Sequence, residues 1–190
     1  MKELIALFDL DDTLVDYAKV LRKDLEKMRC PSEPKIKYVH GKLPRYIKKR
    51  INFIKSSEDW WANLPKRKLG WDILKVVKKM GFRVIILSKT PEVGPPGFGG
   101  KKRWIEKNLG KETEVILASD KGLVYGKVLV DDSPIFIKRW LAHRPRGLVI
   151  MPATSENKGF THPQVIRYNG KNLEQIKKAL KKVKLVALKR

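Results

Sequence analysis

Residues 4–15 read LIALFDLDDTLV, and the rest of the chain is best interpreted from these twelve residues. Its apolar first half predicts a buried strand, because the run is too short for a typical helix and stops abruptly at polar residues. Asp9, Asp11 and Asp12 follow directly, and burying carboxylates is unfavourable unless positive charge lies beside them. Open α/β sheets bind their ligands at the carboxyl ends of their strands. The stretch therefore predicts a site for a metal ion and a phosphate group.

Asp residues are also common after strands for a purely structural reason, because they cap helices and form turns. The short motif alone therefore fits a turn as well as it fits a chemical site. The choice between the two depends on what the rest of the chain places at the same edge of the sheet.

The composition is that of a globular protein. The chain has 190 residues, of which 42% are hydrophobic and 8% aromatic, which excludes a disordered chain and allows one domain with an insertion. No apolar stretch reaches the roughly 18–20 residues of a membrane span, and the N-terminus lacks the pattern of a signal peptide. The single cysteine, Cys30, excludes an internal disulfide and a cysteine-rich zinc site. These features favour a cytoplasmic location without membrane partners.

The formal net charge of +23 is extreme, and it predicts either a lysine-rich solvated surface or a polyanionic partner. Residues 171–190 combine lysines with apolar residues at helical spacing, which is typical of an amphipathic helix with a solvated basic face. Residues 35–55 differ, because they contain eight Lys and Arg residues and no acid, with Tyr38, Tyr46 and Phe53 interleaved. This stretch fits contact with a nucleotide or a nucleic-acid backbone, although aromatic residues at these spacings also occur in cores.

Helices and strands alternate along the chain. Helices are expected over 16–29, from Pro44 to about Lys55, after a Ser57 cap, over 71–80 up to Gly81, over 101–109 after a Gly/Pro loop, over 134–142 and at the C-terminus. Further strands are expected over 82–88, 113–119, 127–130 and 147–152. The alternation predicts a three-layer, Rossmann-like α/β fold with a central parallel sheet. Residues 1–15 and 67–190 would form the core domain, and residues 16–66 a helical insertion after the first strand.

Polar residues follow two other predicted strands at the edge where Asp9 lies. Ser88 ends one strand, with Thr90 shortly after it, and Asp131 and Asp132 follow another. Each of these residues alone fits a turn or a helix cap. Their common position behind buried strands favours a chemical site instead.

These residue types suit phosphoryl transfer. A carboxylate nucleophile can divide hydrolysis into two steps through an aspartyl-phosphate, and a second carboxylate two residues on can protonate the leaving oxygen and activate water. Mg²⁺ prefers hard oxygen ligands and offsets the repulsion between carboxylates and phosphate. A hydroxyl group and a lysine can neutralise the phosphoryl oxygens.

The motifs resemble those of the haloacid dehalogenase (HAD) superfamily. The resemblance rests on the DxDxT pattern at Asp9–Thr13, on Ser88, on Lys101 and on the Asp131-Asp132 pair, in this order along the whole chain. It implies that Asp9 is the nucleophile and Asp11 the general acid and base. It also implies a Mg²⁺ site formed by Asp9, the main-chain oxygen of Asp11, Asp131 as a direct ligand and Asp132 close behind. The implied phosphate-binding residues are Ser88, Lys89 and Lys101.

A narrower resemblance is to the 5′(3′)-deoxyribonucleotidases, carried by segments such as WWANLPKRKLGWDILKVVKKMG and ASDKGLVYGKVLVDDSP. Its spacing places the phosphate lysine at Lys101, with Lys121 as a second basic candidate. The chain departs from that group at Asp12, where glycine is frequent. The resemblance implies that residues 16–66 form a small cap. The substrate pocket would then include Thr13, Trp60, Trp61, Thr90 and Lys121, although the two tryptophans also fit a purely structural role between cap and core.

The leading hypothesis is a Mg²⁺-dependent phosphatase, a phosphoric monoester hydrolase that acts on (deoxy)nucleoside monophosphates. A second hypothesis is a phosphatase of nucleic-acid 5′ or 3′ ends, which the net charge and the acid-free stretch over 35–55 favour. A third is a non-catalytic nucleic-acid-binding protein on the same scaffold, which retention of Asp9, Asp11, Lys101 and Asp131 disfavours. The sequence predicts no oligomeric state.

Overall fold

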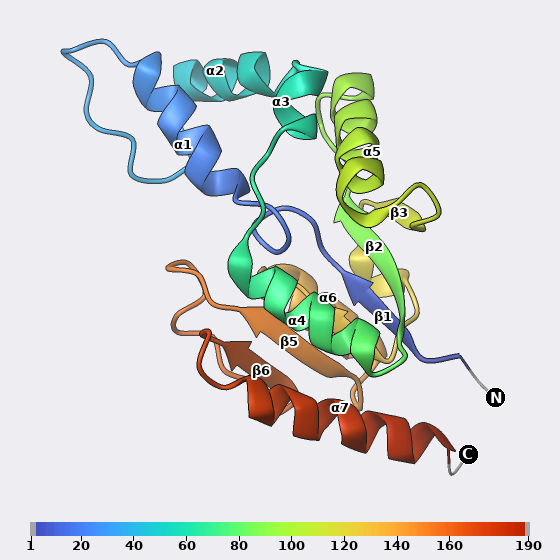
Figure 1. Cartoon of the computed structure of the whole chain (residues 1–190). Helices are drawn as coiled ribbons and strands as arrows, with labels where there is room; N and C mark the ends of the chain where they lie inside the picture. Colours follow the sequence, from blue (N-terminus) through green and yellow to red (C-terminus); the bar gives the residue numbers. More distant parts are fainter. Residues whose placement is uncertain (1–2, 189–190) are drawn as a thin grey trace. The chain divides into compact units, whose positions relative to one another are not determined.

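The computed structural model describes residues 3–188, which form two compact units (Figure 1). The sheet unit contains the residues up to Val15, then Lys66–Lys89 and the residues from Thr113 onward. The helical unit contains Asp16–Pro65 and Thr90–Glu112. The expected division assigned residues 90–112 to the core, whereas they cluster with the helices of the insertion. A role of the helical unit as a cap stays a prediction.

The sheet unit is built on six parallel strands in the order β3-β2-β1-β4-β5-β6. The strands are β1 (Ile5–Phe8), β2 (Arg83–Lys89), β3 (Val115–Ala118), β4 (Val128–Val130), β5 (Leu148–Pro152) and β6 (Val165–Tyr168). The expected α/β fold with a central parallel sheet is therefore confirmed. Because β1 lies between β2 and β4, the carboxyl ends of these three strands are neighbours.

Both faces of the sheet are covered, which explains why its strands are apolar almost throughout. Leu7 and Leu129 pack with Ile137 and Trp140 of α6 (Pro134–His143) in one core cluster. On the opposite face, Figure 1 shows α4 (Lys68–Lys79) and α7 (Leu173–Leu188) lying across the strands. Burial of apolar surface on two sides holds the central strands in place, and with them the residues that follow each strand.

Sequence patterns predicted five strands, and β6 was missed. Its four residues VIRY are only partly buried apart from Tyr168, because the strand lies at the sheet edge. Arg167 also interrupts the apolar run. A short edge strand of this kind buries too little apolar surface to leave a clear hydrophobic pattern.

The helical unit contains α1 (Tyr17–Lys27), α2 (Arg45–Lys55), α3 (Glu58–Ala62) and α5 (Pro95–Leu109). Ser57 is the N-cap residue of α3, as expected, because its hydroxyl accepts a hydrogen bond from the main-chain N–H of Trp60 at 3.2 Å. Trp60 and Trp61 pack edge to face, with ring centroids 5.0 Å apart, and Tyr17 stacks on Trp61 at 5.5 Å. These rings form an aromatic core for the helices.

The expected start of α5 at residue 101 was wrong, because the helix begins at Pro95. Proline is tolerated in the first turn, where its missing N–H has no partner within the helix. The glycines that suggested a loop serve close packing instead. A side chain at Gly100 would place Cβ 2.4 Å from the carbonyl oxygen of Glu58 and from Cβ of Trp61. Only glycine lets α5 approach α3 this closely.

The C-terminal α7 has the expected amphipathic pattern. Ile176 and Leu180 are buried, whereas Lys178, Lys181 and Lys182 are exposed. The last two basic residues of the predicted helix, 189 and 190, lie outside the described residues. Within the described part of the chain, no helix is both long and apolar enough to cross a membrane.

Candidate active site

A tight loop after β1 turns the chain at the edge of the sheet. The carbonyl oxygen of Leu10 accepts hydrogen bonds from the N–H groups of Leu14 at 2.9 Å and Val15 at 3.0 Å. Asp12 adopts a positive φ of 54°, a conformation that Asp tolerates better than most residues. The loop holds the acidic residues of the first motif together at the end of the central strand.

Three carboxylates meet at this edge. Asp9 follows β1 and Asp131 follows β4, and the Asp9 N–H donates to the carbonyl oxygen of Val130 at 2.8 Å. Asp9 and Asp131 are buried, and Asp132 is partly buried. Carboxylate oxygens of all three residues lie within 4.8 Å of one another. The structure thus brings together the two acidic motifs of the sequence.

A buried lysine neutralises part of this charge. Lys121 lies in a short 3-10 helix, η1 (Lys121–Leu123), between β3 and β4. Its Nζ donates hydrogen bonds to Oδ1 of Asp9 at 2.6 Å and to Oδ2 of Asp131 at 2.8 Å. The side chain of Asp120 caps η1 by accepting from the N–H of Gly122 at 2.8 Å. Lys121 is therefore the lysine that the sheet unit places at the carboxylates.

Burial and mutual repulsion shift the ionisation of this cluster. Burial raises the pKa of Asp9 from 3.8 to about 7; Lys121 opposes the shift, and Asp131 and Asp11 add to it. The pKa of Asp132 also lies well above its ordinary value, through burial first and then through neighbouring carboxylates. Burial lowers the pKa of Lys121, but its two carboxylate partners outweigh burial and hold it above its ordinary value. The ammonium group is therefore charged at neutral pH.

The donor set fits a divalent cation. When all three carboxylates are ionised, they and the ammonium group carry a net charge of −2, which a divalent cation would neutralise. All available ligand atoms are carboxylate oxygens, the hard donors that Mg²⁺ prefers. Asp9, Asp131 and Asp132 form this group, and coordination by the main-chain oxygen of Asp11 stays a prediction.

The buried side-chain amide of Asn157 holds the main chain of the second acidic motif, Asp131-Asp132, in place. Nδ2 of Asn157 donates to the carbonyl oxygens of Asp132 at 3.0 Å and Pro152 at 2.9 Å. Oδ1 of Asn157 accepts from the N–H of Thr154 at 3.0 Å and from Nε of Arg167 at 3.0 Å. These hydrogen bonds join the loop after β5, which carries Asn157, to the loop after β4, to the end of β5 and to Arg167 in β6. Asn157 was not predicted as a site residue, because a lone asparagine in a loop carries no local signal.

The remaining predicted residues of the sheet unit have distinct positions. Ser88 is fully buried near the end of β2, next to β1, and Lys89 at the end of the same strand is exposed. The Thr13 hydroxyl donates to Oδ1 of Asp132 at 3.4 Å. Asp12 lies 3.7 Å from Nη1 of Arg67, a residue that the sequence analysis did not single out. The proposed phosphate-binding role of Ser88 and Lys89 stays a prediction.

Four other predicted residues belong to the helical unit. Lys101 is buried in α5, with its Nζ 5.0 Å from the ring centroid of Trp61. Trp60 donates from Nε1 to Oδ2 of Asp24 at 3.0 Å, and Thr90 begins the second segment of this unit. Their predicted roles in binding phosphate and substrate stay predictions. A clue for preferring Lys121 was available, because it comes three residues after the end of β3, whereas Lys101 lies within a helix.

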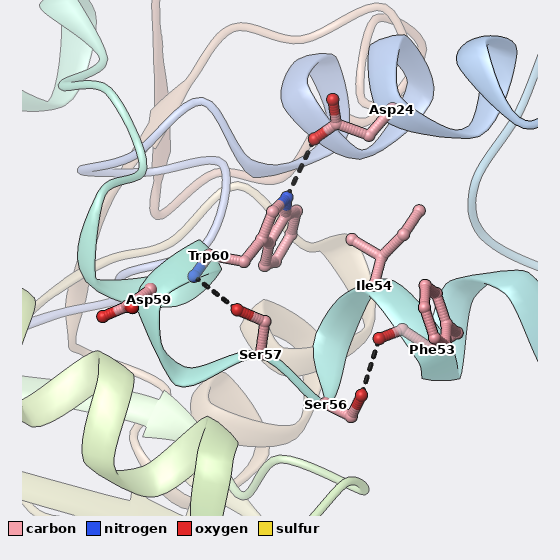
Figure 2. A pocket seen from close by; sticks show the side chains of 7 residues that line it. All are labelled: Asp24, Phe53, Ile54, Ser56, Ser57, Asp59 and Trp60. Atoms are coloured by element: carbon pink, nitrogen blue, oxygen red, sulfur yellow. Dashed lines mark hydrogen bonds between the residues drawn. The ribbon is translucent and has the colours of Figure 1, made fainter.

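The helical unit also contains an open pocket of about 640 Å³ (Figure 2). Phe53, Ile54 and Trp60 supply its apolar surface, and Figure 2 shows the hydrogen bond from Trp60 to Asp24, which also lines the pocket. Asp59, another lining residue, pairs with Arg103 at 2.8 Å. Asp24 likewise pairs with Lys27 at 2.7 Å, so both lining carboxylates already have a cation partner, and the apolar, aromatic part of the surface suits a flat ring.

Three solved structures have a similar fold at low sequence identity. A Burkholderia xenovorans LB400 protein assigned as a haloacid dehalogenase-like hydrolase matches with a TM-score of 0.53 and 15% identity, over 93% of this chain and 99% of its own. A HAD-superfamily hydrolase of Ehrlichia chaffeensis has a TM-score of 0.50 and 15% identity, over 96% and 98%. A Thermotoga maritima protein assigned as a β-phosphoglucomutase has a TM-score of 0.50 and 17% identity, over 95% and 99%. No model of a known protein family matches the sequence.

The chain therefore has the fold of the haloacid dehalogenase-like hydrolases, as the resemblance implied. At 15–17% identity the likeness establishes the fold, and the chemistry has to be argued from the site. The narrower resemblance to 5′(3′)-deoxyribonucleotidases stays a prediction.

Proposed function

We propose that the chain is a Mg²⁺-dependent phosphatase that hydrolyses (deoxy)nucleoside monophosphates through an aspartyl-phosphate. One observation carries the proposal: Asp9 directly follows the central strand and clusters with the buried Asp131, the partly buried Asp132 and a hydrogen-bonded Lys121. A purely structural ion pair needs one carboxylate for one lysine, but here three carboxylates lie in one cluster with Lys121. The additional carboxylates repel one another and are unfavourable unless they bind a ligand such as a cation.

Asp9 is the nucleophile in this proposal. One of its carboxylate oxygens attacks the phosphorus of the monoester, while Asp11 donates a proton to the alcohol oxygen as the phosphorus–oxygen bond breaks. The product is an alcohol and a phosphorylated Asp9. Asp11 then takes a proton from water, whose oxygen attacks the phosphorus. Inorganic phosphate leaves, and the Asp9 carboxylate is restored.

Positive charge balances the phosphoryl group during this reaction. Lys121 would donate to a phosphoryl oxygen, since its ammonium already lies within hydrogen-bonding distance of the nucleophile. Asp9, Asp131 and Asp132 would hold Mg²⁺, which when bound neutralises carboxylate and phosphate charge as a Lewis acid. Ser88 would contribute a hydroxyl from the end of β2, and Lys101 is kept as an alternative phosphate lysine.

The nucleotide part of the proposal rests on the segments that resemble 5′(3′)-deoxyribonucleotidases, and on the aromatic rings of the helical unit. Aromatic faces stack on any base, so the partly exposed Trp60 suits a substrate pocket of broad base preference, whereas Trp61 is buried in the aromatic core of the helical unit. Phosphate ends of nucleic acids are the second candidate substrate. Exposed Lys and Arg side chains over 35–49 favour it.

The test is phosphate release from ribo- and deoxyribonucleoside monophosphates and from 5′- or 3′-phosphorylated oligonucleotides, with Mg²⁺ and with EDTA. We expect Mg²⁺-dependent turnover of mononucleotides, and its loss in Asp9→Asn. Glu174→Gln is the matched control, because it removes an exposed carboxylate on α7 that pairs only with Lys177 among the described residues.

Turnover of oligonucleotides alone would move the function to nucleic-acid ends. Turnover that persists in Asp9→Asn would contradict the aspartyl-phosphate route. The absence of turnover with every phosphomonoester in the panel would overturn the proposal and leave only the fold.

A further inference from the structure

One exposed side of α2 presents cations and aromatic rings together. We define this basic–aromatic face by Arg45, Tyr46, Lys48, Lys49 and Phe53, all of which are exposed. The preceding segment extends it with exposed Lys35, Lys37, Tyr38 and Lys42. The segment and α2 follow α1 in Figure 1 and belong to the helical unit.

The cations of this face are not used for folding. Across residues 3–188 the structure shows no acidic partner for Arg45, Lys48 or Lys49. Arg50, on the same helix, shows the contrast, because it pairs with Glu33 at 2.6 Å. The acid-free sequence over 35–55 leaves repulsion among the exposed cations without local compensation. A polyanionic ligand would remove that repulsion.

The aromatic rings of the face are equally unusual. Phe53 is 70% exposed and Tyr46 is 40% exposed, although both side chains are large and mostly apolar. Tyr46, Lys49 and Phe53 lie at helical spacings of three and four residues, so they form one stripe with a cation between two rings. The guanidinium of Arg50 lies 5.2 Å from the Tyr46 ring centroid, and this cation–π contact stabilises the position of the ring.

The basic–aromatic face fits some polyanions better than others, and membranes, duplexes and single strands can be compared in turn. The apolar side of α2, formed by Ile47, Ile51 and Ile54, is already buried, so the helix has no apolar face left to insert into a membrane. Bases in a duplex are stacked on one another and hide their faces. A single strand offers both phosphates for cations and free base faces for aromatic rings.

The pocket at the C-terminal end of α2 extends the same surface. Phe53 belongs to both, and Trp60 lies further along the pocket (Figure 2). The pocket has about 640 Å³ of space and an apolar, aromatic lining from Phe53, Ile54 and Trp60. The pocket therefore suits one base of a nucleic-acid strand that is bound along α2. The phosphates next to this base would lie on the lysines of the basic–aromatic face.

We infer that the basic–aromatic face binds single-stranded nucleic acid, with phosphates on Arg45, Lys48 and Lys49 and bases against Tyr46 and Phe53. The inference goes beyond the proposed phosphatase activity and does not depend on it. It uses only residues of the helical unit, and none belongs to the carboxylate cluster.

The experiment measures binding of fluorescent single-stranded oligodeoxyribonucleotides and oligoribonucleotides by anisotropy over a series of salt concentrations. The probes lack terminal phosphates and the buffer contains EDTA, so phosphatase turnover plays no part. Two variants remove the charges (Arg45→Gln, Lys48→Gln, Lys49→Gln) or the rings (Tyr46→Ala, Phe53→Ala). The matched control removes three exposed charges from α7 (Lys178→Gln, Lys181→Gln, Lys182→Gln).

We expect the charge variant to bind at least tenfold more weakly at low salt. Its plot of log Kobs against log salt should become shallower by about 2, since single strands contribute about 0.7 per phosphate contact. The ring variant should lose roughly tenfold or more in affinity with the salt slope unchanged. The α7 control should stay within about twofold of the unmodified protein. Thermal unfolding of each variant checks that it folds.

Several outcomes would overturn the inference. An equal loss of affinity in the α2 and α7 charge variants would mean that net charge alone attracts nucleic acid. Duplex binding as tight as single-strand binding would exclude stacking on the rings. Binding to phosphatidylserine vesicles without binding to either oligonucleotide would make the partner a membrane. Comparison of the DNA and RNA probes shows which of the two kinds of single strand binds more tightly. The Asp9→Asn variant should bind both probes as the unmodified protein does, because Asp9 lies outside the basic–aromatic face.

Discussion

Nζ of Lys121 lies 2.6 Å from Oδ1 of Asp9, although the two residues are 112 positions apart in the chain. The contact is possible because η1 follows β3 and because β4, the strand after η1, pairs directly with β1. The same ammonium also reaches Asp131 at 2.8 Å. One buried cation is thus shared by the residues that end two neighbouring strands.

This contact separates two candidates for the phosphate lysine. We expect Lys121→Met to lower kcat/KM for the best phosphomonoester by roughly 100-fold or more, because it removes a preorganised donor and leaves two buried carboxylates without their cation. Lys101→Met is the matched variant, since that lysine is also buried and lies 5.0 Å from the Trp61 ring centroid. Steady-state phosphate release measures both. Loss of activity in Lys101→Met alone would return the role to Lys101.

The cluster should make stability depend on pH in the absence of metal. Asp9 releases its proton near pH 4 when unfolded and near pH 7 when folded, so the folded state binds more protons within this window. The contribution of Asp9 to stability therefore falls as pH rises from about 4 to about 7. We expect Asp9→Asn to be more stable than the unmodified protein at pH 8 in EDTA, by an amount on the order of 1–4 kcal/mol.

At pH 4 the advantage of Asp9→Asn should largely vanish, because both side chains are then uncharged. Mg²⁺ should raise the melting temperature of the unmodified protein at pH 8 and have a much smaller effect on the variant. Denaturant or thermal unfolding at the two pH values checks this. An advantage that does not change with pH would show that the charge of Asp9 is not the cause.

Asn157 should support the metal site through Asp132. In Asn157→Ala the carbonyl oxygens of Asp132 and Pro152 lose a buried donor, and we expect a loss of about 2–4 kcal/mol in unfolding free energy. Mg²⁺ should also stabilise this variant less, because the loop that carries Asp132 is no longer held. The control is Asn169→Ala, an exposed asparagine whose Oδ1 accepts from the N–H of Lys171. Unfolding with and without Mg²⁺ separates the two effects.

Gly70 fixes the approach of α4 to the loop after β1. A Cβ at this position would lie 1.9 Å from the carbonyl oxygen of Thr13, which is main chain and cannot swing away. We expect Gly70→Ala to destabilise the protein by about 2 kcal/mol or more and to lower activity. Gly159→Ala is the control, because its Cβ would have nothing within 4 Å. Equal melting temperatures for the two variants would rule out tight packing at Gly70.

The sequence predicted most of the sheet because its signals are local. The apolar runs before Asp9, Ser88 and Asp131 are short and end abruptly, which is typical of buried parallel strands. Buried strands in one parallel sheet end at a common edge, so the carboxylates were expected to meet there, and they do. The start of α5 was missed because prolines and glycines suggest a loop until their packing partners are known.

The lysine that contacts the carboxylates could not be predicted from neighbouring residues in the sequence. Lys101 and Lys121 both follow plausible elements, and the resemblance to the 5′(3′)-deoxyribonucleotidases implied Lys101. The structure places Lys121 between Asp9 and Asp131, because the pairing of β4 with β1 determines which loop reaches the site.

The α/β class, the central strand and the carboxylates at its end could be predicted from the sequence, since hydrophobic periodicity and polar residues at strand ends act over a few neighbouring positions. The folded structure was needed to show that Lys121 neutralises Asp9, that Asn157 holds Asp132 and that residues 90–112 join the helical unit. These choices depend on burial and hydrogen bonds between residues far apart in the chain. Such contacts form only when strand pairing and helix packing bring distant segments together.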